Sequence, residues 1–155
     1  MYYSISELAQ KRESPLVVDT YMDLEFARPG GCPVQKVGKA HIIGVVSRTA
    51  EFVEFDGSYE IPYTDYCARC LEEFDKVLIC NIKGYFSKLD SVVDEDIYKY
   101  EGHKIPLGLA VEDDFILNIP FRDFCLEDCL GLCPKCGCNL NKTKCDCASE
   151  YNQEV

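Results

Sequence analysis

The sequence has few of the residues and motifs on which enzyme active sites are usually built. It contains two histidines, His41 and His103, and neither lies beside a serine or cysteine in a way that indicates a catalytic triad. It has no P-loop, no Gly-x-Gly-x-x-Gly fingerprint and no His-Glu-x-x-His motif. The familiar phosphate, dinucleotide and metalloprotease sites are therefore excluded. The sequence predicts a protein that is not an enzyme.

Basic residues and long apolar runs are also scarce. Lysine and arginine number 16 against 27 aspartates and glutamates, and the net charge of -11 opposes binding to nucleic acid through the protein's own field. Residues 50–120 hold most of the excess acid. No stretch approaches the roughly 20 apolar residues of a membrane span, and the first residues lack the basic and apolar regions of a signal peptide. We expect a cytoplasmic protein that does not enter membranes.

Cysteine, in contrast, is abundant, with 11 residues in the chain. In a reducing cytoplasm, thiols persist, so metal binding or redox chemistry explains this number better than a set of disulfides. An odd count also fits poorly with complete disulfide pairing.

The last cysteine cluster has the spacing of a metal site. Cys133 and Cys136 form a Cys-x-x-Cys pair, and Cys145 and Cys147 follow closely enough to complete a tetrahedral set of four sulfurs. Such a closed set leaves no position for a substrate water, so the ion would stabilise the fold. We predict a structural zinc knuckle. Its tight turn would be made by Pro134 and Gly137, Cys138 could replace one of the four ligands, and an iron–sulfur centre is the alternative to zinc.

A second pair, Cys67 and Cys70, is open to three interpretations. With Cys125 and Cys129, which have the i, i+4 spacing of a helix, it could form a second metal site. It could instead be a redox dithiol, or a pair of unliganded structural cysteines. The acidic residues that follow the pair, Glu72, Glu73 and Asp75, are expected to keep the pKa of Cys67 high.

The hydrophobic pattern predicts a β-rich protein. Alternation with a period of two indicates strands over 16–26, 34–47, 51–55, 59–66, 78–86 and 97–100, with Asp56–Gly57 as a hairpin turn. Short helices are expected around residues 5–9 and over 107–119, where Pro120 would end the second. The predicted fold class is α+β: an antiparallel meander or partly open barrel with one or two short helices and the C-terminal zinc knuckle.

We divide the chain into a β-rich domain over 1–124, a cysteine-rich zinc-binding appendage over 125–147 and a tail over 148–155. The tail is expected to fray.

Three segments resemble the YceD family of bacterial and plastid proteins: residues 67–74, 116–120 and 127–141. The likeness covers most of the chain from about residue 66 onward. The positions that match the family's two motifs are Cys67, Arg69, Cys70, Cys129, Cys133, Cys136, Gly137, Asn139, Leu140, Asn141, Cys145 and Cys147. Members are implicated in the accumulation of large-subunit ribosomal RNA, and their genes commonly lie beside that of a small zinc-ribbon ribosomal protein. The resemblance therefore implies a role in ribosome biogenesis.

Together these observations predict a non-enzymatic factor that supports the synthesis, processing or accumulation of large-subunit ribosomal RNA. Its acidic face would bind a basic ribosomal protein, and ribosomal RNA would be bound weakly or indirectly. The alternatives are a thiol-disulfide oxidoreductase that uses Cys67 and Cys70, and a nucleic-acid binder that uses the knuckle. The residues expected to contact a partner are Arg69, Lys135, Lys142 and Lys144.

Overall fold

The structure, a computed structural model, describes residues 1–10, 15–26, 31–49, 52–88 and 97–147. Contacts divide the chain into two compact units. Unit 1 comprises residues 1–63 and 76–119, and unit 2 comprises residues 64–75 with the chain from 120 onward. The domain limits expected from the sequence, at 124 and 147, stay a prediction, and the expected tail lies outside the described residues.

Strands make up most of the regular structure. The strands are β1 (Tyr3–Ser4), β2 (Leu16–Met22), β3 (Lys36–Val37), β4 (Ala40–Arg48), β5 (Val53–Tyr66), β6 (Glu73–Ser87), β7 (Ile97–Lys99) and β8 (Lys104–Ile105). The helices are α1 (Ser6–Gln10) and α2 (Leu107–Asn118). One sheet has the order β2-β4-β5-β6-β7 with β3 beside β5, and β1 pairs with β8 in a second. The prediction of a β-rich protein with two short helices is confirmed.

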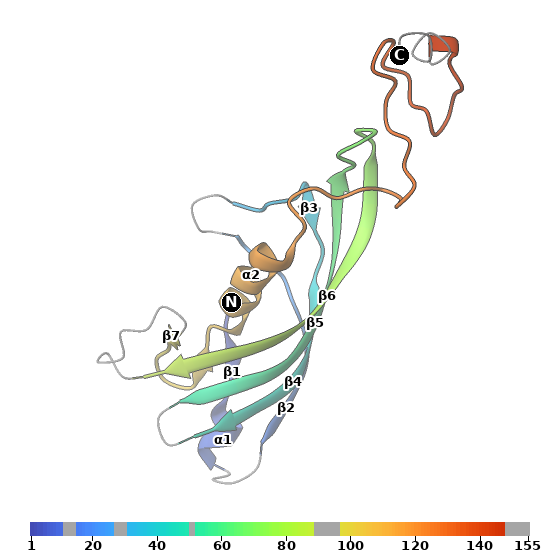
Figure 1. Cartoon of the computed structure of the whole chain (residues 1–155). Coiled ribbons are helices and arrows are strands. Elements are labelled where there is room, and N and C mark those ends of the chain that lie inside the picture. The colour runs from blue at the N-terminus through green and yellow to red at the C-terminus, as the bar shows by residue number, and fades with distance from the viewer. Residues whose placement is uncertain (11–14, 27–30, 50–51, 89–96, 148–155) are drawn as a thin grey trace. The chain divides into compact units, whose positions relative to one another are not determined.

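The core of unit 1 lies between the larger sheet and α2, and Figure 1 shows this helix against one face of the strands. Ile42 of β4 and Phe55 of β5 are fully buried, as is Phe115 of α2. The ring of Phe115 meets that of Tyr63 edge-on, with centroids 6.3 Å apart. The alternation read from the sequence therefore places one face of the sheet in the core. No helix among the described residues is long and apolar enough to cross a membrane.

The expected hairpin turn at Asp56–Gly57 is wrong, because β5 runs straight through these residues. Gly57 lies directly opposite Gly44 of β4, and the ring of Phe55 packs beside the two glycines. The glycine therefore allows a close approach of two backbones and a ring. A two-residue hairpin turn at Asp-Gly needs a positive φ at the glycine. Gly57 does not have a positive φ, and it lies within a strand instead.

The expectation of an antiparallel arrangement throughout also needs one correction. A strand is expected over 97–100, and β7 is a strand at the edge of the sheet, but it pairs parallel with β6, with Tyr85 opposite Ile97. Alternation reveals that a segment is a strand and which face it buries. Strand direction depends on the connection, which here includes residues 89–96, outside the described part of the chain.

We predict that Gly57→Ala lowers the free energy of unfolding by about 2 kcal/mol, the range of overpacked cores. A Cβ at this position would lie 2.3 Å from the carbonyl oxygen of Ile43 and 2.7 Å from the Cα of Gly44. Urea denaturation followed by circular dichroism measures the change. Ser58→Ala, on the neighbouring residue, serves as the control and should cost less than about 0.5 kcal/mol. Equal losses in the two variants would contradict the close approach at Gly57.

Candidate metal centres

The first cysteine cluster, formed by Cys67, Cys70, Cys125 and Cys129, assembles in unit 2. Cys67 follows the end of β5, and its carbonyl accepts a hydrogen bond from the N–H of Leu71, which folds the first pair into a tight turn. The N–H of Ala68 donates to the carbonyl of Asp123 at 2.9 Å. This bond draws the C-terminal segment beside the turn.

Cys125 and Cys129 join this cluster without forming a helix, although their spacing suggested one. Residues 120–131 are bends and turns. The N–H of Cys129 donates to the carbonyl of Leu126 in one such turn. Spacing of i, i+4 is compatible with a helix but does not require it, and here the backbone instead follows the first pair.

The distances between sulfurs in the first cluster fit a tetrahedral ion. The sulfur of Cys67 lies 3.7 Å from that of Cys129, and that of Cys70 lies 3.7 Å from that of Cys125. All four sulfurs lie within 4.8 Å of one another. Four thiolates at the usual zinc–sulfur distance of about 2.3 Å stand about 3.8 Å apart, whereas a disulfide needs about 2.05 Å. The arrangement could hold a metal ion and contains no disulfide.

Arg69 supports the first cluster from outside. Its guanidinium lies 4.3 Å from the centroid of the Phe124 ring and donates to the carbonyls of Glu127, at 3.2 Å, and Cys129, at 3.0 Å. A planar guanidinium can stack and donate at the same time. Arg69 thus fixes the backbone that carries Cys129, and its contact with a partner stays a prediction.

The second cluster contains the cysteines expected from the sequence, Cys133, Cys136, Cys145 and Cys147, whose sulfurs also lie within 4.8 Å of one another. Gly137 has a φ of 71°, and its N–H donates to the carbonyl of Cys133 at 2.9 Å. This left-handed conformation favours glycine, so Gly137 closes the turn as predicted.

Cys138 is not a member of the four-sulfur group of the second cluster. Its backbone carbonyl accepts from the N–H of Cys133 at 2.9 Å, so the residue helps to shape the turn through its main chain. Its thiol lies close enough to Cys136 for a hydrogen bond, which raises the pKa of Cys138 to about 12.

Backbone N–H groups stabilise the thiolate form of one cysteine in each cluster. The neighbouring sulfurs disfavour ionisation of other cysteines in the same cluster. Burial would raise the pKa of Cys67, but N–H groups of Cys125, Cys70 and Arg69 lower it to about 6. In the second cluster, N–H groups of residues 136 and 135 lower the pKa of Cys133 to about 6. The expectation that nearby acids keep the pKa of Cys67 high is therefore wrong, because these amides lie closer to the sulfur.

The remaining thiols cannot all ionise beside these two. Burial and hydrogen bonds to neighbouring thiols raise the pKa of Cys125 to about 12, and Cys136 chiefly raises that of Cys147 to about 11. Four adjacent thiolates repel one another unless a cation is present. The electrostatics of both clusters therefore suit a bound metal better than four free thiols.

Asn141 connects the two clusters. Its side-chain nitrogen lies 3.3 Å from the sulfur of Cys129 in the first cluster and donates to the side-chain oxygen of Asn139 at 2.9 Å. Its side-chain oxygen accepts from the N–H of Leu130 at 2.8 Å. Asn139 pairs with Leu132 in an isolated bridge just before Cys133. Asn141 thus ties the loop of the second cluster to a ligand of the first, a role that sequence reasoning did not assign.

The knuckle lysines expected to contact a partner differ in their surroundings. The ammonium of Lys142 pairs with the carboxylate of Glu72, and this contact lowers the pKa of Glu72. Lys142 is therefore partly neutralised by the turn that carries the first cysteine pair. Lys135 and Lys144 are exposed. A partner contact by any of these lysines stays a prediction.

The two histidines both belong to unit 1 and have structural contacts. The ring of His41 stacks on that of Tyr21, with centroids 4.3 Å apart, and its Nε2 lies 2.9 Å from the carboxylate of Asp19. His103 is exposed, and its carbonyl accepts from the N–H of Ile5. His41 thus packs across two paired strands, and His103 lies at the surface.

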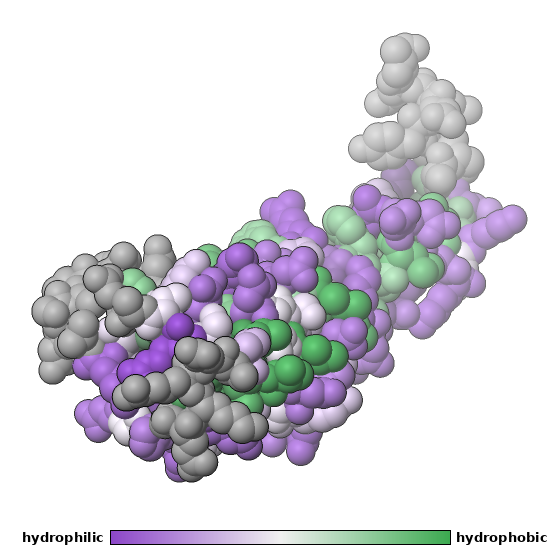
Figure 2. All heavy atoms as spheres, turned by 90° about the horizontal axis from the view of Figure 1, so that it is seen from below, coloured by the Kyte–Doolittle hydropathy of each residue, from purple (hydrophilic) through white to green (hydrophobic). Residues whose placement is uncertain are grey.

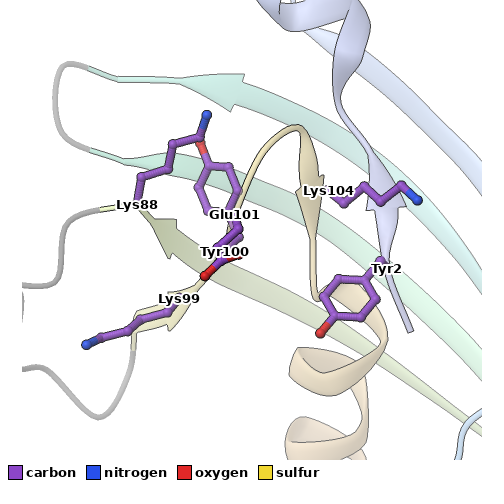
Figure 3. A pocket seen from close by; sticks show the side chains of 6 residues that line it. All are labelled: Tyr2, Lys88, Lys99, Tyr100, Glu101 and Lys104. Carbon is purple, nitrogen blue, oxygen red and sulfur yellow. The ribbon is translucent and has the colours of Figure 1, made fainter.

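Unit 1 also contains a cavity of about 580 Å³ that sequence reasoning missed. It is lined by Tyr2, Lys88, Lys99, Tyr100, Glu101 and Lys104. Figure 3 shows Lys99 and Lys104 extending in opposite directions, with the acidic Glu101 between them in sequence and space. The lysines do not converge on one point, as a phosphate cradle requires. Their positions in three separate segments left no signal in the sequence.

The fold and the two clusters define a β-rich protein with two four-cysteine sites on its C-terminal unit. The model of the family described as large ribosomal RNA subunit accumulation protein YceD matches residues 55–154. The protein belongs to the YceD family. This match spans both clusters, and the resemblance inferred from the two cysteine motifs is confirmed.

Several proteins are similar to this chain. Uncharacterized proteins of Mycobacterium tuberculosis and Mycobacterium bovis are each 31% identical over 100 residues, which is 61% of this chain and 48% of theirs. The large ribosomal RNA subunit accumulation protein YCED homolog 1, chloroplastic, of Arabidopsis thaliana is 42% identical over 50 residues, 32% of this chain and 16% of its own length. The chain spans about half the length of the mycobacterial relatives. No solved structure matches it.

We expect native mass spectrometry of protein purified under reducing conditions to find two metal ions per chain, one for each cluster. Cys70→Ser and Cys136→Ser should each remove one ion, because each deletes a ligand of a closed set. Cys138→Ser is the matched control and should retain both. Protein without bound metal, or a Cys70→Ser variant that keeps two ions, would contradict this assignment.

We further expect Asn141→Ala to release metal to a chromogenic chelator about tenfold faster than the unchanged protein. Groups that hydrogen-bond to metal ligands commonly contribute a factor of about 10–100 to affinity. Thr143→Ala is the control, since Thr143 is anchored by its backbone N–H, which donates to the carbonyl of Asn139. Identical release rates for Asn141→Ala and the control would show that Asn141 does not support the first cluster.

Proposed function

We propose that this protein is a non-enzymatic ribosome-biogenesis factor that supports large-subunit ribosomal RNA by binding a basic ribosomal protein. Two zinc ions would stabilise unit 2. The observation that carries this proposal is the pair of four-cysteine clusters within the region that matches the YceD family. The family's description names accumulation of large ribosomal subunit RNA.

Zinc suits both clusters because each offers four sulfur donors that lie within 4.8 Å of one another. The sulfur–sulfur distances of 3.7 Å in the first cluster are close to the edge length of a tetrahedron of four thiolates around zinc. Iron also binds four thiolates, and metal analysis distinguishes the two. A set of four protein ligands leaves no coordination position for substrate, so the ions would stabilise the fold without reacting.

The charge of the chain favours a basic protein over RNA as the direct partner. A net charge of -11 repels phosphates, and two sites with four thiolates around a divalent cation would each add further negative charge. The excess acid falls in residues 50–120, most of which belong to unit 1. Ribosomal RNA would then be reached through the protein partner.

One observation favours a second candidate, a thiol-disulfide oxidoreductase. Backbone N–H groups lower the pKa of Cys67 to about 6, which a reactive thiol would need. The same amides would also stabilise a thiolate that binds a metal. Thiol titration before and after chelation separates the two functions: a metal site protects Cys67 until the ion is removed, and a redox site does not.

We expect affinity capture from an extract of the source cells to retain a basic large-subunit ribosomal protein, with binding that survives nuclease treatment. Raising the salt from about 0.1 M to about 1 M, which shortens the Debye length from about 10 to about 3 Å, should release it. The purified chain alone should bind ribosomal RNA no better than the roughly 10⁻⁴ to 10⁻⁶ M of non-specific complexes.

A protein bearing Cys70→Ser and Cys136→Ser tests the role of the clusters in cells that lack the natural copy. We expect it to fail to restore large-subunit ribosomal RNA, while Cys138→Ser restores it. Nanomolar, salt-resistant binding of bare RNA by the purified chain would contradict the proposed mechanism and favour a nucleic-acid binder.

A further inference from the structure

The face of the larger sheet opposite α2 carries an apolar patch in unit 1. In β2 and β4, Val18, Ile42 and Val46 are fully buried, so their sequence neighbours project from the other side of the sheet. The apolar side chains that β2 and β4 place on this outer face are those of Val17 and Tyr21, and of Ile43 and Val45. We call these four residues the apolar patch.

The strand register places these side chains side by side, with one carboxylate among them, because Asp19 of β2 lies directly opposite Ile43. Val17 lies directly opposite Val45, and Tyr21 lies opposite His41. Directly paired residues in antiparallel strands have side chains in contact on the same face. The stacked rings of Tyr21 and His41, with an interplanar angle of 6°, extend the patch at one end.

The patch is open to solvent to a degree that sheet faces in stable monomers usually avoid. Val17 is 70% exposed and Tyr21 65%, while Ile43 and Val45 retain 44% and 37%. Figure 2 shows apolar atoms gathered on the face seen from below, bordered by hydrophilic ones. Single exposed apolar residues are common, but a contiguous group bordered by polar residues marks an interaction surface.

A row of carboxylates runs beside the patch on β5. Asp56 lies opposite Val45, Glu60 opposite His41 and Glu54 opposite Ser47. Lys83 of β6 lies 2.9 Å from Asp56 and is a basic residue that neutralises part of the row. Aliphatic side chains and carboxylates thus alternate from strand to strand across one surface.

We propose that this face binds a basic polypeptide segment in which aliphatic residues lie beside lysines or arginines. The aliphatic side chains would cover Val17 and Val45, and the basic side chains would meet the carboxylates of Glu54 and Glu60. The carboxylates attract lysine and arginine but repel the phosphates of RNA, which selects protein as the occupant. The inference deepens the proposed function, on which it rests for a ribosomal protein as the source of the segment.

The test uses the full chain and a fluorescent peptide in which leucine and lysine alternate. The expected result is saturable binding that weakens about tenfold in Val17→Thr/Val45→Thr, a change that keeps β-branched side chains but adds polar atoms. Glu54→Gln/Glu60→Gln should weaken binding about fivefold and flatten its dependence on salt. In the unchanged protein, amide chemical shifts of Ile43 and Ser58 should move as the peptide is added, a readout that needs no variant to fold.

Matched controls change similar residues elsewhere. Leu117→Ser alters an apolar residue of α2 that is 83% exposed, and Glu7→Gln/Glu101→Gln removes two exposed acids from other segments. Neither should change the affinity by more than about twofold. Peptides that alternate serine with lysine, or leucine with glutamate, should bind at least about tenfold more weakly, because each lacks one half of the complementary chemistry.

The inference would be overturned by equal losses of affinity in face and control variants, by equal binding of the leucine–glutamate peptide, or by a dimer of this chain that Val17→Thr/Val45→Thr dissociates. Preferential binding of single-stranded RNA to this face would also overturn it. Cell-extract capture separates the two proposals. If the face variants still capture the ribosomal protein, this face is not its binding site, and the proposed function stands. If the face binds the peptide but no ribosomal protein is captured, the proposed partner is wrong.

Discussion

Repulsion among gathered thiolates is the constraint on which unit 2 depends. Residues 120–145 contain no helix or strand among the elements the structure describes, and their backbone hydrogen bonds form turns and one isolated bridge. Burial and the neighbouring thiols raise the pKa of Cys125, and the neighbouring Cys136, with burial, raises that of Cys147. A cation in each cluster would reverse this repulsion and hold the cysteines together through the metal. A short segment with a small core commonly needs such a staple.

The side chains around the clusters show how a metal site can be prepared by the chain itself. Arg69 stacks on Phe124 and donates to two carbonyls, so it holds the backbone before Cys129 in place. A lysine at this position could not combine stacking with forked hydrogen bonds. Asn141 adds a donor to the sulfur of Cys129 and links it to the second loop. Loss of either cluster would therefore disturb the other, because they share this hydrogen-bonded connection.

Local spacing predicted the second cluster well, because its four cysteines lie within 15 consecutive residues, 133–147, and the turn at Gly137 needs a left-handed conformation. The first cluster joins two segments more than 50 residues apart, so the sequence could suggest its four cysteines but not the backbone conformation around them. The helix expected at Cys125 is a series of turns. Gly57 failed as a turn signal for the same reason: its role depends on Gly44, in another strand. The outer-face patch required the register between strands, which alternation alone does not supply.

Net charge describes this protein poorly until each carboxylate is placed in the fold. Residues 112–114 of α2 are acidic, but each carboxylate accepts a hydrogen bond within unit 1. Glu112 accepts from the backbone N–H of Glu25. Asp113 accepts from the hydroxyl of Tyr98, and Asp114 accepts from the hydroxyl of Tyr59. These acids are used within unit 1. Glu54 and Glu60 of β5 instead face outward beside exposed aliphatic side chains. These two carboxylates of β5 lie where apolar contacts can add affinity and direction to a long-range attraction.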